Sequence, residues 1–251
     1  MTLFGTGTST GIPVIGCACA VCTSTDPRNR RMRPGVRLDV EGGTVVFDTS
    51  PDFREQSLRF GLDRVDAVLY THAHADHVFG LDDLRAFNFR QRAAIPCYGS
   101  ADTLARLRNI FSYVFEEGQE GGGRPKIDLV PVEAPFELLG ERVVPVPVWH
   151  GEMEVLGYRL GDFALVTDVN AIPETSFELL EGVRTLVLSA LRYTRHPTHY
   201  NLDEAIAVAA RIGARRTLLT HIAHEVDHTD LRVALPEGVE LAHDGLVVEL
   251  D

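Results

Sequence analysis

The sequence predicts an α/β protein of the αββα type, in which two mixed β-sheets pack face to face and helices flank them. Apolar residues form 45% of the 251 residues and charged residues 24%, proportions that are ordinary for a chain with a buried core. Short apolar runs between Gly and Asp turns are typical of strands. They alternate with helical stretches in both halves of the chain, so each half supplies a sheet with its own helices. We expect residues 1–251 to form a single domain.

The first half of the chain contains a hairpin, two helices and a buried strand. Gly42 and Gly43 separate two apolar runs and supply the turn chemistry of a hairpin. The expected elements are a hairpin at 37–50, a helix at 51–61 that starts with Pro51 and stops at Gly61, a strand at 65–71 and a helix at 101–115. Residues 116–126 are expected to form a surface loop and are a candidate lid.

The second half contains more strands and one helix with clear start and stop signals. Asn201 and Glu204 form a capping box and Gly213 supplies the stop, which predicts a helix at 201–213. Strands are expected at 141–151, 155–162, 163–169, 184–190 and 215–220. Strand ends at one edge of a sheet can converge on a single point. Four candidate site residues each follow an apolar strand run: His72, His150, Asp168 and His221.

The charge balance disfavours nucleic acid as a partner. Asp and Glu number 36 against 24 Lys and Arg, for a formal net charge of −12. Nucleic-acid binders need a basic face to displace counterions from phosphates. The densest basic stretch, 27–35, is expected to be a solvated loop, with contact to an anionic substrate as the alternative. A small phosphate ester remains compatible with this charge.

The N-terminus and the cysteines indicate the compartment. No signal-peptide pattern is present and no apolar run approaches about 18 residues, so neither secretion nor a membrane partner is expected. Cys17, Cys19 and Cys22 are too crowded for disulfides. Clustered thiols in a reducing compartment are more often metal ligands. We expect a cytoplasmic protein, either a monomer or a homodimer.

Four candidate metal ligands lie directly after the strand at 65–71, in the sequence THAHADH: His72, His74, Asp76 and His77. In an extended loop His72 and His74 project to the same side and can share one ion, while a turn can point Asp76 and His77 at a second. Imidazole and carboxylate suit Zn²⁺ and Mn²⁺ and fit hydrolytic chemistry. A structural site needs four ligands, so the additional strand-end residues indicate two ions. The alternative is a solvated histidine-rich loop.

With these residues the chain resembles the metallo-β-lactamase-fold hydrolases, whose signature is HxHxDH followed by a His, an Asp and a His at later strand ends. The resemblance covers essentially the whole chain and implies the metallo-β-lactamase fold, an αββα sandwich. It is closest to the PhnP-like branch, the phosphoribosyl cyclic phosphodiesterases. Three stretches carry the narrower match: GTGTSTGIPVIGCACAVC at 5–22, HPTHYNLDEA at 196–205 and LTHIAHEVD at 219–227.

The resemblance implies a role for each matching residue. One ion would be held by His72, His74 and His150, the other by Asp76, His77 and His221, with Asp168 bridging. Two ions about 3.5–4 Å apart can turn a shared water into hydroxide and hold phosphoryl oxygens. Asp76 is therefore both a catalytic and a metal-binding candidate. His/Asp sets accept Mn²⁺ and Zn²⁺, so the identity of the two catalytic ions stays open.

The resemblance also implies a structural Zn²⁺. In THIAHE, His221 takes the catalytic role and His224 is left for three cysteines, which gives a closed Cys₃His set: Cys17, Cys19, Cys22 and His224. Cys97 is the rival fourth ligand, but its apolar surroundings are those of a small buried hydrophobe. Such a site would stabilise the active site without taking part in the chemistry.

A general acid is needed because cleavage of a phosphodiester leaves an alkoxide. His199 matches a PhnP-like histidine thought to protonate it, and His196 is its competitor or a substrate contact. Arg192 and Arg195 border the same loop and could bind a phosphate, with solvated arginine as the alternative.

Three remaining features carry no expected chemistry. His228 and His243 lie in no motif, so surface or core roles are expected for both. The Gly-rich stretch 5–11 lacks a P-loop lysine and a following helix, which favours a strand turn with close backbone approach over a phosphate cradle.

We therefore expect a dinuclear metal-dependent phosphodiesterase that opens a small cyclic phosphodiester, such as a phosphoribosyl 1,2-cyclic phosphate, to a phosphomonoester. The same site acting on a linear or cyclic nucleotide, an RNA 3′ end, a thioester or a lactone is one alternative. A non-catalytic accessory protein like PqqB is another, against which the complete ligand set argues. The substrate follows from the resemblance alone, because one fold hosts many chemistries.

Overall fold

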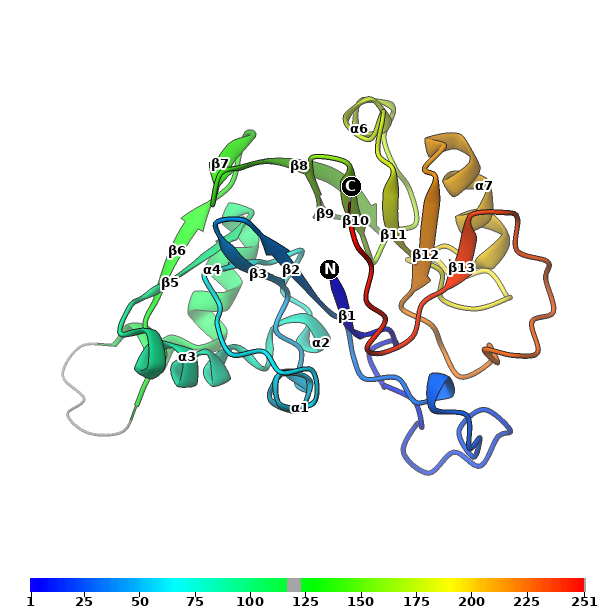
Figure 1. Ribbon diagram of the computed structural model, residues 1–251, viewed down its shortest axis with the longest axis horizontal. Helices are drawn as coiled ribbons and strands as arrows, with labels where there is room; N and C mark the ends of the chain where they lie inside the picture. Colours follow the sequence, from blue (N-terminus) through cyan, green and yellow to red (C-terminus); the bar gives the residue numbers. More distant parts are fainter. Residues whose placement is uncertain (117–122, 251) are drawn as a thin grey trace.

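A computed structural model of the protein describes residues 1–116 and 123–250, and its strands form two sheets (Figure 1). The six-stranded sheet has the order β1 (Thr2–Gly5), β2 (Gly35–Val40), β3 (Gly43–Phe47), β4 (Ala67–Leu69), β5 (Ile95–Gly99) and β6 (Ile127–Pro131). Its first three strands pair antiparallel and the strands from β3 to β6 pair parallel. The predicted hairpin at 37–50 is confirmed as β2 and β3.

The second sheet has seven strands. Its order is β13 (Val239–Leu241), β12 (Arg216–Thr220), β11 (Thr185–Ser189), β10 (Phe163–Val166), β9 (Met153–Leu160), β8 (Glu141–His150) and β7 (Phe136–Leu138). The strands from β7 to β10 pair antiparallel, and those from β10 to β13 pair parallel. Both sheets are therefore mixed, as the sequence predicts.

The helices begin and end close to the expected signals. They are α1 (Phe53–Arg59), α2 (Ala75–Val78), α3 (Leu84–Gln91), α4 (Ala101–Ile110), α5 (Ser112–Phe115), α6 (Glu174–Leu179) and α7 (Leu202–Ile212), with short 3-10 turns η1 (Pro27–Asn29) and η2 (Leu81–Asp83). The single helix expected at 101–115 is wrong, because the chain breaks at Phe111 (φ −109°, ψ 42°) between α4 and α5. Among the described residues, no helix is long and apolar enough to cross a membrane.

The core has three apolar layers, which give the αββα sandwich. Between the sheets, the ring of Phe47 on β3 lies 6.1 Å from that of Tyr158 on β9 and 5.9 Å from that of Phe163 on β10. A second cluster packs the outer face of the seven-stranded sheet under α7, and a third packs the other sheet under α1, α3 and α4. Burial on both faces accounts for the continuous apolar runs of the inner strands.

The basic stretch 27–35 differs from the expected solvated loop because several of its residues are buried, among them Asn29 and Arg31. Arg31 is 1% exposed. Its Nη1 donates to Thr6 Oγ1 at 2.7 Å and to the carbonyl of Ala242 at 2.6 Å. The guanidinium thus ties the N-terminal strand to the C-terminal segment. Of the loop predicted at 116–126, residues 117–122 lie outside the described part of the chain.

Candidate metal centre

The histidine motif folds as a strand end followed by one helical turn. The buried chain of β4 continues through Tyr70 and Thr71 to His72, and His74 then serves as the N-cap of α2. The turn is packed against the end of β3, because the amide of Thr49 donates to the carbonyl of His77 at 2.7 Å. Gly80 permits this approach: a Cβ there would lie 2.1 Å from the carbonyl oxygen of Ser50. The packing turns Asp76 and His77 inward.

The first ligand set consists of three histidines: His72, His74 and His150. Their ligand atoms lie within 4.8 Å of one another. Nδ1 of His150, at the end of β8, donates to the carbonyl of Thr198 at 2.8 Å, which leaves Nε2 free to bind an ion. Thr71 Oγ1 lies 3.0 Å from Nδ1 of His72, and Nε2 of His72 is buried without a hydrogen-bond partner.

The second ligand set combines two carboxylates and two histidines: Asp76, His77, Asp168 and His221. Nε2 of His77 lies 3.2 Å from Oδ2 of Asp168 and 3.4 Å from Oδ2 of Asp76. Nε2 of His221 lies 3.4 Å from Oδ1 of Asp168. All four side chains are buried. Asp168 follows β10 and His221 follows β12, so the carboxyl ends of two parallel strands on either side of β11 supply them.

Asp168 joins the two sets. Asp168 is a member of the second set. A carboxylate oxygen of Asp168 also lies within 4.8 Å of ligand nitrogens of His150 and His199. Nδ1 of His199 is 3.8 Å from Oδ1 of Asp168, and the ring centroid of His199 is 4.6 Å from that of His150. Every strand-end residue expected at the site is thus brought to one place, with His199 beside them.

The electrostatics of the pocket favour a cation. Burial alone would lower the pKa of His77, but the surrounding carboxylates, Asp168 first, raise it well above its usual range. Burial would raise the pKa of Asp168, but its interactions with the imidazoles of His221 and His77 hold it well below its usual value. Burial keeps His72 and His221 neutral by lowering the pKa of each. Neutral imidazoles beside ionised carboxylates are the form in which these groups bind metal.

The donors also pass a test of fit for metal ions. Within the described residues, four buried imidazole nitrogens have no hydrogen-bond partner: His72 Nε2, His77 Nε2, His199 Nδ1 and His221 Nδ1. A buried polar atom without a partner is costly. Nε2 of His72 lies among the ligand atoms of the first set and Nε2 of His77 among those of the second, so a cation at each set would remove this cost. The chemistry of the donors, imidazole and carboxylate, suits Zn²⁺ and Mn²⁺.

Asp48 is a site residue that sequence reasoning missed. Its Oδ2 accepts from Nδ1 of His77 at 2.7 Å, and its two oxygens accept from the amide and the hydroxyl of Thr71 at 2.8 and 2.9 Å. Asp48 directly follows β3 and adopts φ +59°, a backbone conformation uncommon outside glycine. Its position at a strand end was the available signal, the same one that identified Asp168.

A second candidate metal site lies between the N-terminal loop and the segment after β12. Nδ1 of His224 is 3.3 Å from the Sγ of Cys17, 3.5 Å from that of Cys19 and 3.6 Å from that of Cys22. The four ligand atoms lie within 4.8 Å of one another. Cys97 is 0% exposed in β5, where it pairs in register with Val68 and takes no part in this cluster.

The loop of His199 borders an open cavity of about 400 Å³. His196, His199, Asn170 and Arg195 line it. Nδ1 of His196 accepts from the amide and the hydroxyl of Thr198 at 3.3 and 3.2 Å, so the proton of its neutral form is on Nε2. Arg192 is not among the lining residues. Its guanidinium reaches the carbonyls of its own loop and lies 3.8 Å from Glu225, so its expected substrate contact stays a prediction.

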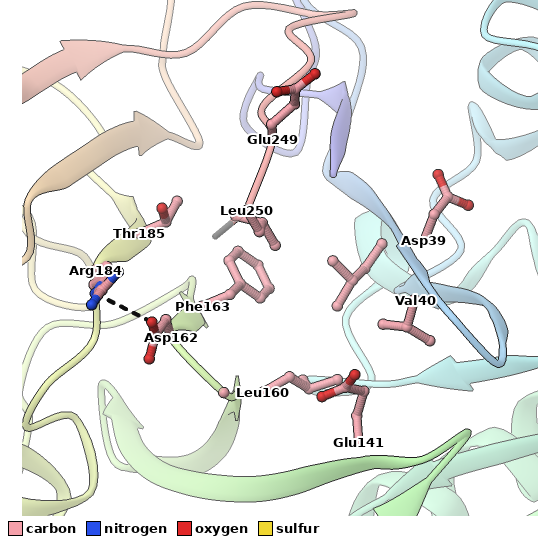
Figure 2. A pocket seen from close by; sticks show the side chains of 12 residues that line it. Asp39, Val40, Glu141, Leu160, Asp162, Phe163, Arg184, Thr185, Glu249 and Leu250 are labelled. Carbon is pink, nitrogen blue, oxygen red and sulfur yellow. Dashed lines mark ion pairs between the residues drawn. The ribbon is translucent and has the colours of Figure 1, made fainter.

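Another cavity, of about 240 Å³, has no histidine in its lining (Figure 2). Phe163 and Thr185 line it, and they pair in register at the amino ends of β10 and β11. Asp168 is at the opposite end of β10. Arg184 and Asp162 form an ion pair of 3.3 Å at its rim. This cavity is separate from the candidate metal centre.

Comparison with known proteins gives one family and several relatives. Residues 44–222 match the profile of the beta-lactamase superfamily domain. A solved structure described as a new diphosphatase from the PhnP family is 44% identical, with a TM-score of 0.93 over 100% of this chain and 97% of that chain. Zn²⁺-bound PqqB from Methylobacterium extorquens has a TM-score of 0.79 at 18% identity over 99% of both chains, which shows a shared fold.

One longer relative carries a different name. An octanoyltransferase of Porphyromonas gingivalis is 37% identical over 254 residues, which cover 99% of this chain. The chain spans about half of that protein's length, 51%. Since the other half is unmatched, the name does not assign an activity to the matched part.

Proposed function

This chain belongs to the beta-lactamase superfamily, and we propose that it is a metal-dependent hydrolase of phosphoester bonds whose substrate is a small cyclic phosphodiester. The product would be a phosphomonoester. The observation that carries this proposal is the junction of two ligand sets at Asp168, with the ring of His199 beside it. Such an arrangement offers both a site for two cations and a nearby proton donor.

The chain's own residues would divide the work as follows. One ion would be held by His72, His74 and His150. The other would be held by Asp76, His77 and His221, and Asp168 would bridge the two ions. When bound, the two ions would activate a water molecule and draw charge from the phosphoryl oxygens. Asp48 and Thr198 fix the ring orientation of His77 and His150.

His199 would supply the proton that the leaving oxygen needs. As water adds to phosphorus and the ring P–O bond breaks, the alkoxide takes a proton from the His199 imidazolium, and the proton released by the water restores the charged ring, so that the alcohol and the monoester result. Burial lowers the pKa of His199 to about 3, so without substrate the ring is neutral at pH 7. An anionic phosphodiester beside the ring favours the imidazolium and moves this pKa upward, the direction that the acid role requires.

A diphosphate diester is a second candidate substrate. The 44% identity between this chain and a diphosphatase of the PhnP family supports this candidate. The cavity beside His199 also has room for a second phosphate, and Arg195 there has an exposed side chain that can pair with an anion.

Phosphorus NMR distinguishes the two substrates. Zn²⁺- or Mn²⁺-loaded protein is incubated with ribose 1,2-cyclic 5-phosphate, and in a parallel tube with ADP-ribose, a diphosphate diester. A His199→Ala variant serves as the control for the acid. We expect the cyclic diester signal to convert to a monoester, with a rate reduced at least ~100-fold in the variant.

Each other outcome changes the proposal. Cleavage of ADP-ribose alone would replace the cyclic substrate by a diphosphate. Conversion at an undiminished rate in His199→Ala would keep the reaction and remove the acid. No cleavage of either compound by metal-replete protein would reject both candidates.

A further inference from the structure

We infer that Thr8 is a substrate-binding residue whose hydroxyl donates a hydrogen bond to a phosphoryl oxygen at the second ligand set. The inference rests on the proposed function, since it assumes an anionic phosphorus substrate at this centre. Thr8 belongs to the Gly-rich stretch 5–11, for which neither the ligand sets nor the Cys₃His cluster accounts.

The backbone of Thr8 is held directly against the segment of His221. Gly7 pairs in parallel with Ile222, the residue after His221. The amide of Ile222 donates to the carbonyl of Thr6 at 2.9 Å, and the amide of Thr8 donates to the carbonyl of Ile222 at 3.2 Å. The Gly-rich stretch therefore runs beside the segment that carries His221 of the second ligand set. As expected from its sequence, it forms a turn after β1 with close backbone approach, and no helix follows it.

The hydroxyl of Thr8 faces the atom of His221 that points to the carboxylates. Thr8 Oγ1 lies 3.3 Å from Nε2 of His221, and the same nitrogen lies 3.4 Å from Oδ1 of Asp168. That nitrogen has a single lone pair. When a cation takes the lone pair, it is no longer available to Thr8, and the hydroxyl must donate to another acceptor.

The position of the Thr8 hydroxyl favours an anionic phosphoryl oxygen as its acceptor. Thr8 is only partly buried, whereas His221 and Asp168 are buried, so the hydroxyl lies where the centre opens to ligand. Hydrogen bonds to ionised acceptors are shorter and stronger than those between neutral groups. A neutral hydroxyl also suits an anion beside carboxylates, because it adds a donor without adding charge.

The stretch is also held rigidly before substrate arrives. Thr6 Oγ1 accepts from Nη1 of the buried Arg31 at 2.7 Å and donates to Oδ1 of Asp244 at 2.8 Å. On the far side of Thr8, Nε of Arg33 donates to the carbonyl of Ser9 at 3.1 Å. A donor fixed on both sides loses little entropy when it binds, which is the property expected of a preorganised contact.

The test compares Thr8→Val, which keeps the shape and removes the hydroxyl, with Thr8→Ser, which keeps the hydroxyl. Thr10→Val in the same stretch is the matched control, because Thr10 is exposed. Calorimetry measures the Kd of inorganic phosphate for the zinc-loaded proteins, and a competition titration measures their zinc affinity. We expect phosphate to bind at least ~10-fold more weakly to Thr8→Val, with zinc affinity unchanged and the other two variants like wild type.

Two results of the binding measurements would overturn the inference: an unchanged phosphate Kd in Thr8→Val, or a parallel loss of zinc affinity, which would make Thr8 a support for His221. The readout does not depend on turnover. If no phosphoester is cleaved but Thr8→Val still weakens phosphate binding, the proposed function fails and the role of Thr8 stands. If Thr8→Val cleaves the substrate with unchanged KM and kcat, the role of Thr8 fails and the function stands.

Discussion

The Nδ1 atom of His77 lies 2.7 Å from Oδ2 of Asp48, and through this carboxylate the two ligand sets share one support. Asp48 also accepts from the hydroxyl of Thr71 at 2.9 Å. Because that hydroxyl has given its proton to Asp48, it accepts from Nδ1 of His72 at 3.0 Å. One carboxylate thus fixes a histidine of the second set directly and a histidine of the first set through one hydroxyl. Both Nε2 atoms are left free for ions.

Replacing Asp48 with Asn should weaken metal binding at both sets. The variant keeps the size of the side chain but loses the charge that holds the Nδ1 proton of His77, and such changes typically cost about 10–100-fold in metal affinity. Competition with a chelating dye measures the zinc affinity. Asp39→Asn, at an exposed carboxylate on β2, is the control. Equal affinities for the three proteins would refute the role of Asp48.

Removing one cysteine should remove one zinc equivalent without emptying the histidine sets. In zinc-loaded Cys17→Ser the Cys₃His cluster loses a ligand, so we expect metal analysis to give one fewer zinc per chain and a lower melting temperature, since bound metal stabilises the folded state. Cys97→Ala is the matched control and should keep the full zinc content. A loss of zinc in Cys97→Ala would make Cys97 a zinc ligand. A full zinc content in Cys17→Ser would refute the Cys₃His site.

The loss of activity in His199→Ala should depend on the leaving group of the substrate. If His199 protonates the leaving oxygen, His199→Ala should lose at least ~100-fold in kcat for an alkyl phosphodiester. The loss should be small for a p-nitrophenyl diester, whose leaving group needs no proton. Steady-state kinetics on both substrates measures the two losses. Equal losses would indicate that His199 only positions the substrate.

Helix α7 should depend on its N-cap. The side chain of Asn201 accepts from the amide of Glu204 at 2.9 Å, and the carboxylate of Glu204 accepts from the amide of Asn201 at 3.0 Å. Asn201→Ala should lower the free energy of unfolding by about 1 kcal/mol. Urea denaturation measures the loss, and Asn201→Asp, which keeps the cap, should lose much less. No change in Asn201→Ala would contradict the capping account.

His228 should make stability fall at acidic pH. Burial, followed by the nearby Arg31, lowers the pKa of His228 in the folded chain to about 4. The unfolded side chain titrates near pH 6.5. Between these values the unfolded state binds the extra proton, so the stabilisation is complete above about pH 6.5 and is lost as the pH falls toward 4.

The variant His228→Asn isolates this contribution. Its Oδ1 can accept from Nη2 of Arg31, which donates to Nδ1 of His228 at 3.1 Å. Melting temperatures at pH 7, 6 and 5 should fall less steeply for the variant than for wild type in the same metal state. Parallel profiles would show that His228 does not carry this dependence.

The sequence predicted those parts of the fold whose signals are local. The hairpin around Gly42 and Gly43 and the capped helix from Asn201 to Gly213 depend on turn and cap chemistry that a few residues specify, and both are confirmed. The break at Phe111 was missed because apolar period alone does not show where a helix must bend to follow its sheet. Strands such as β7 and β13 have three residues each, too few for a periodic pattern.

The candidate site divides in the same way. Ligands that follow strands were visible in the sequence as His and Asp after apolar runs, and the structure places them together. Supports such as Asp48 and the carbonyl of Thr198 act through contacts between segments far apart in the chain. The sequence shows only that Asp48 follows a strand, and it does not show which histidine this carboxylate holds. Arg31 was assigned to a solvated loop because charge is usually exposed. Its burial reflects partners far away in the chain, such as His228 at a separation of 197 positions and Ala242 at 211.

The central claim is that this chain holds three ions in two kinds of site, and anomalous X-ray diffraction at the zinc edge tests it most directly. Crystals of zinc-loaded protein should show three peaks per chain. One is expected among the cysteines and His224, one among His72, His74 and His150, and one between Asp76, His77 and His221, with Asp168 contacting both of the latter. A map with a peak at the cysteines and none among the histidines would contradict the account.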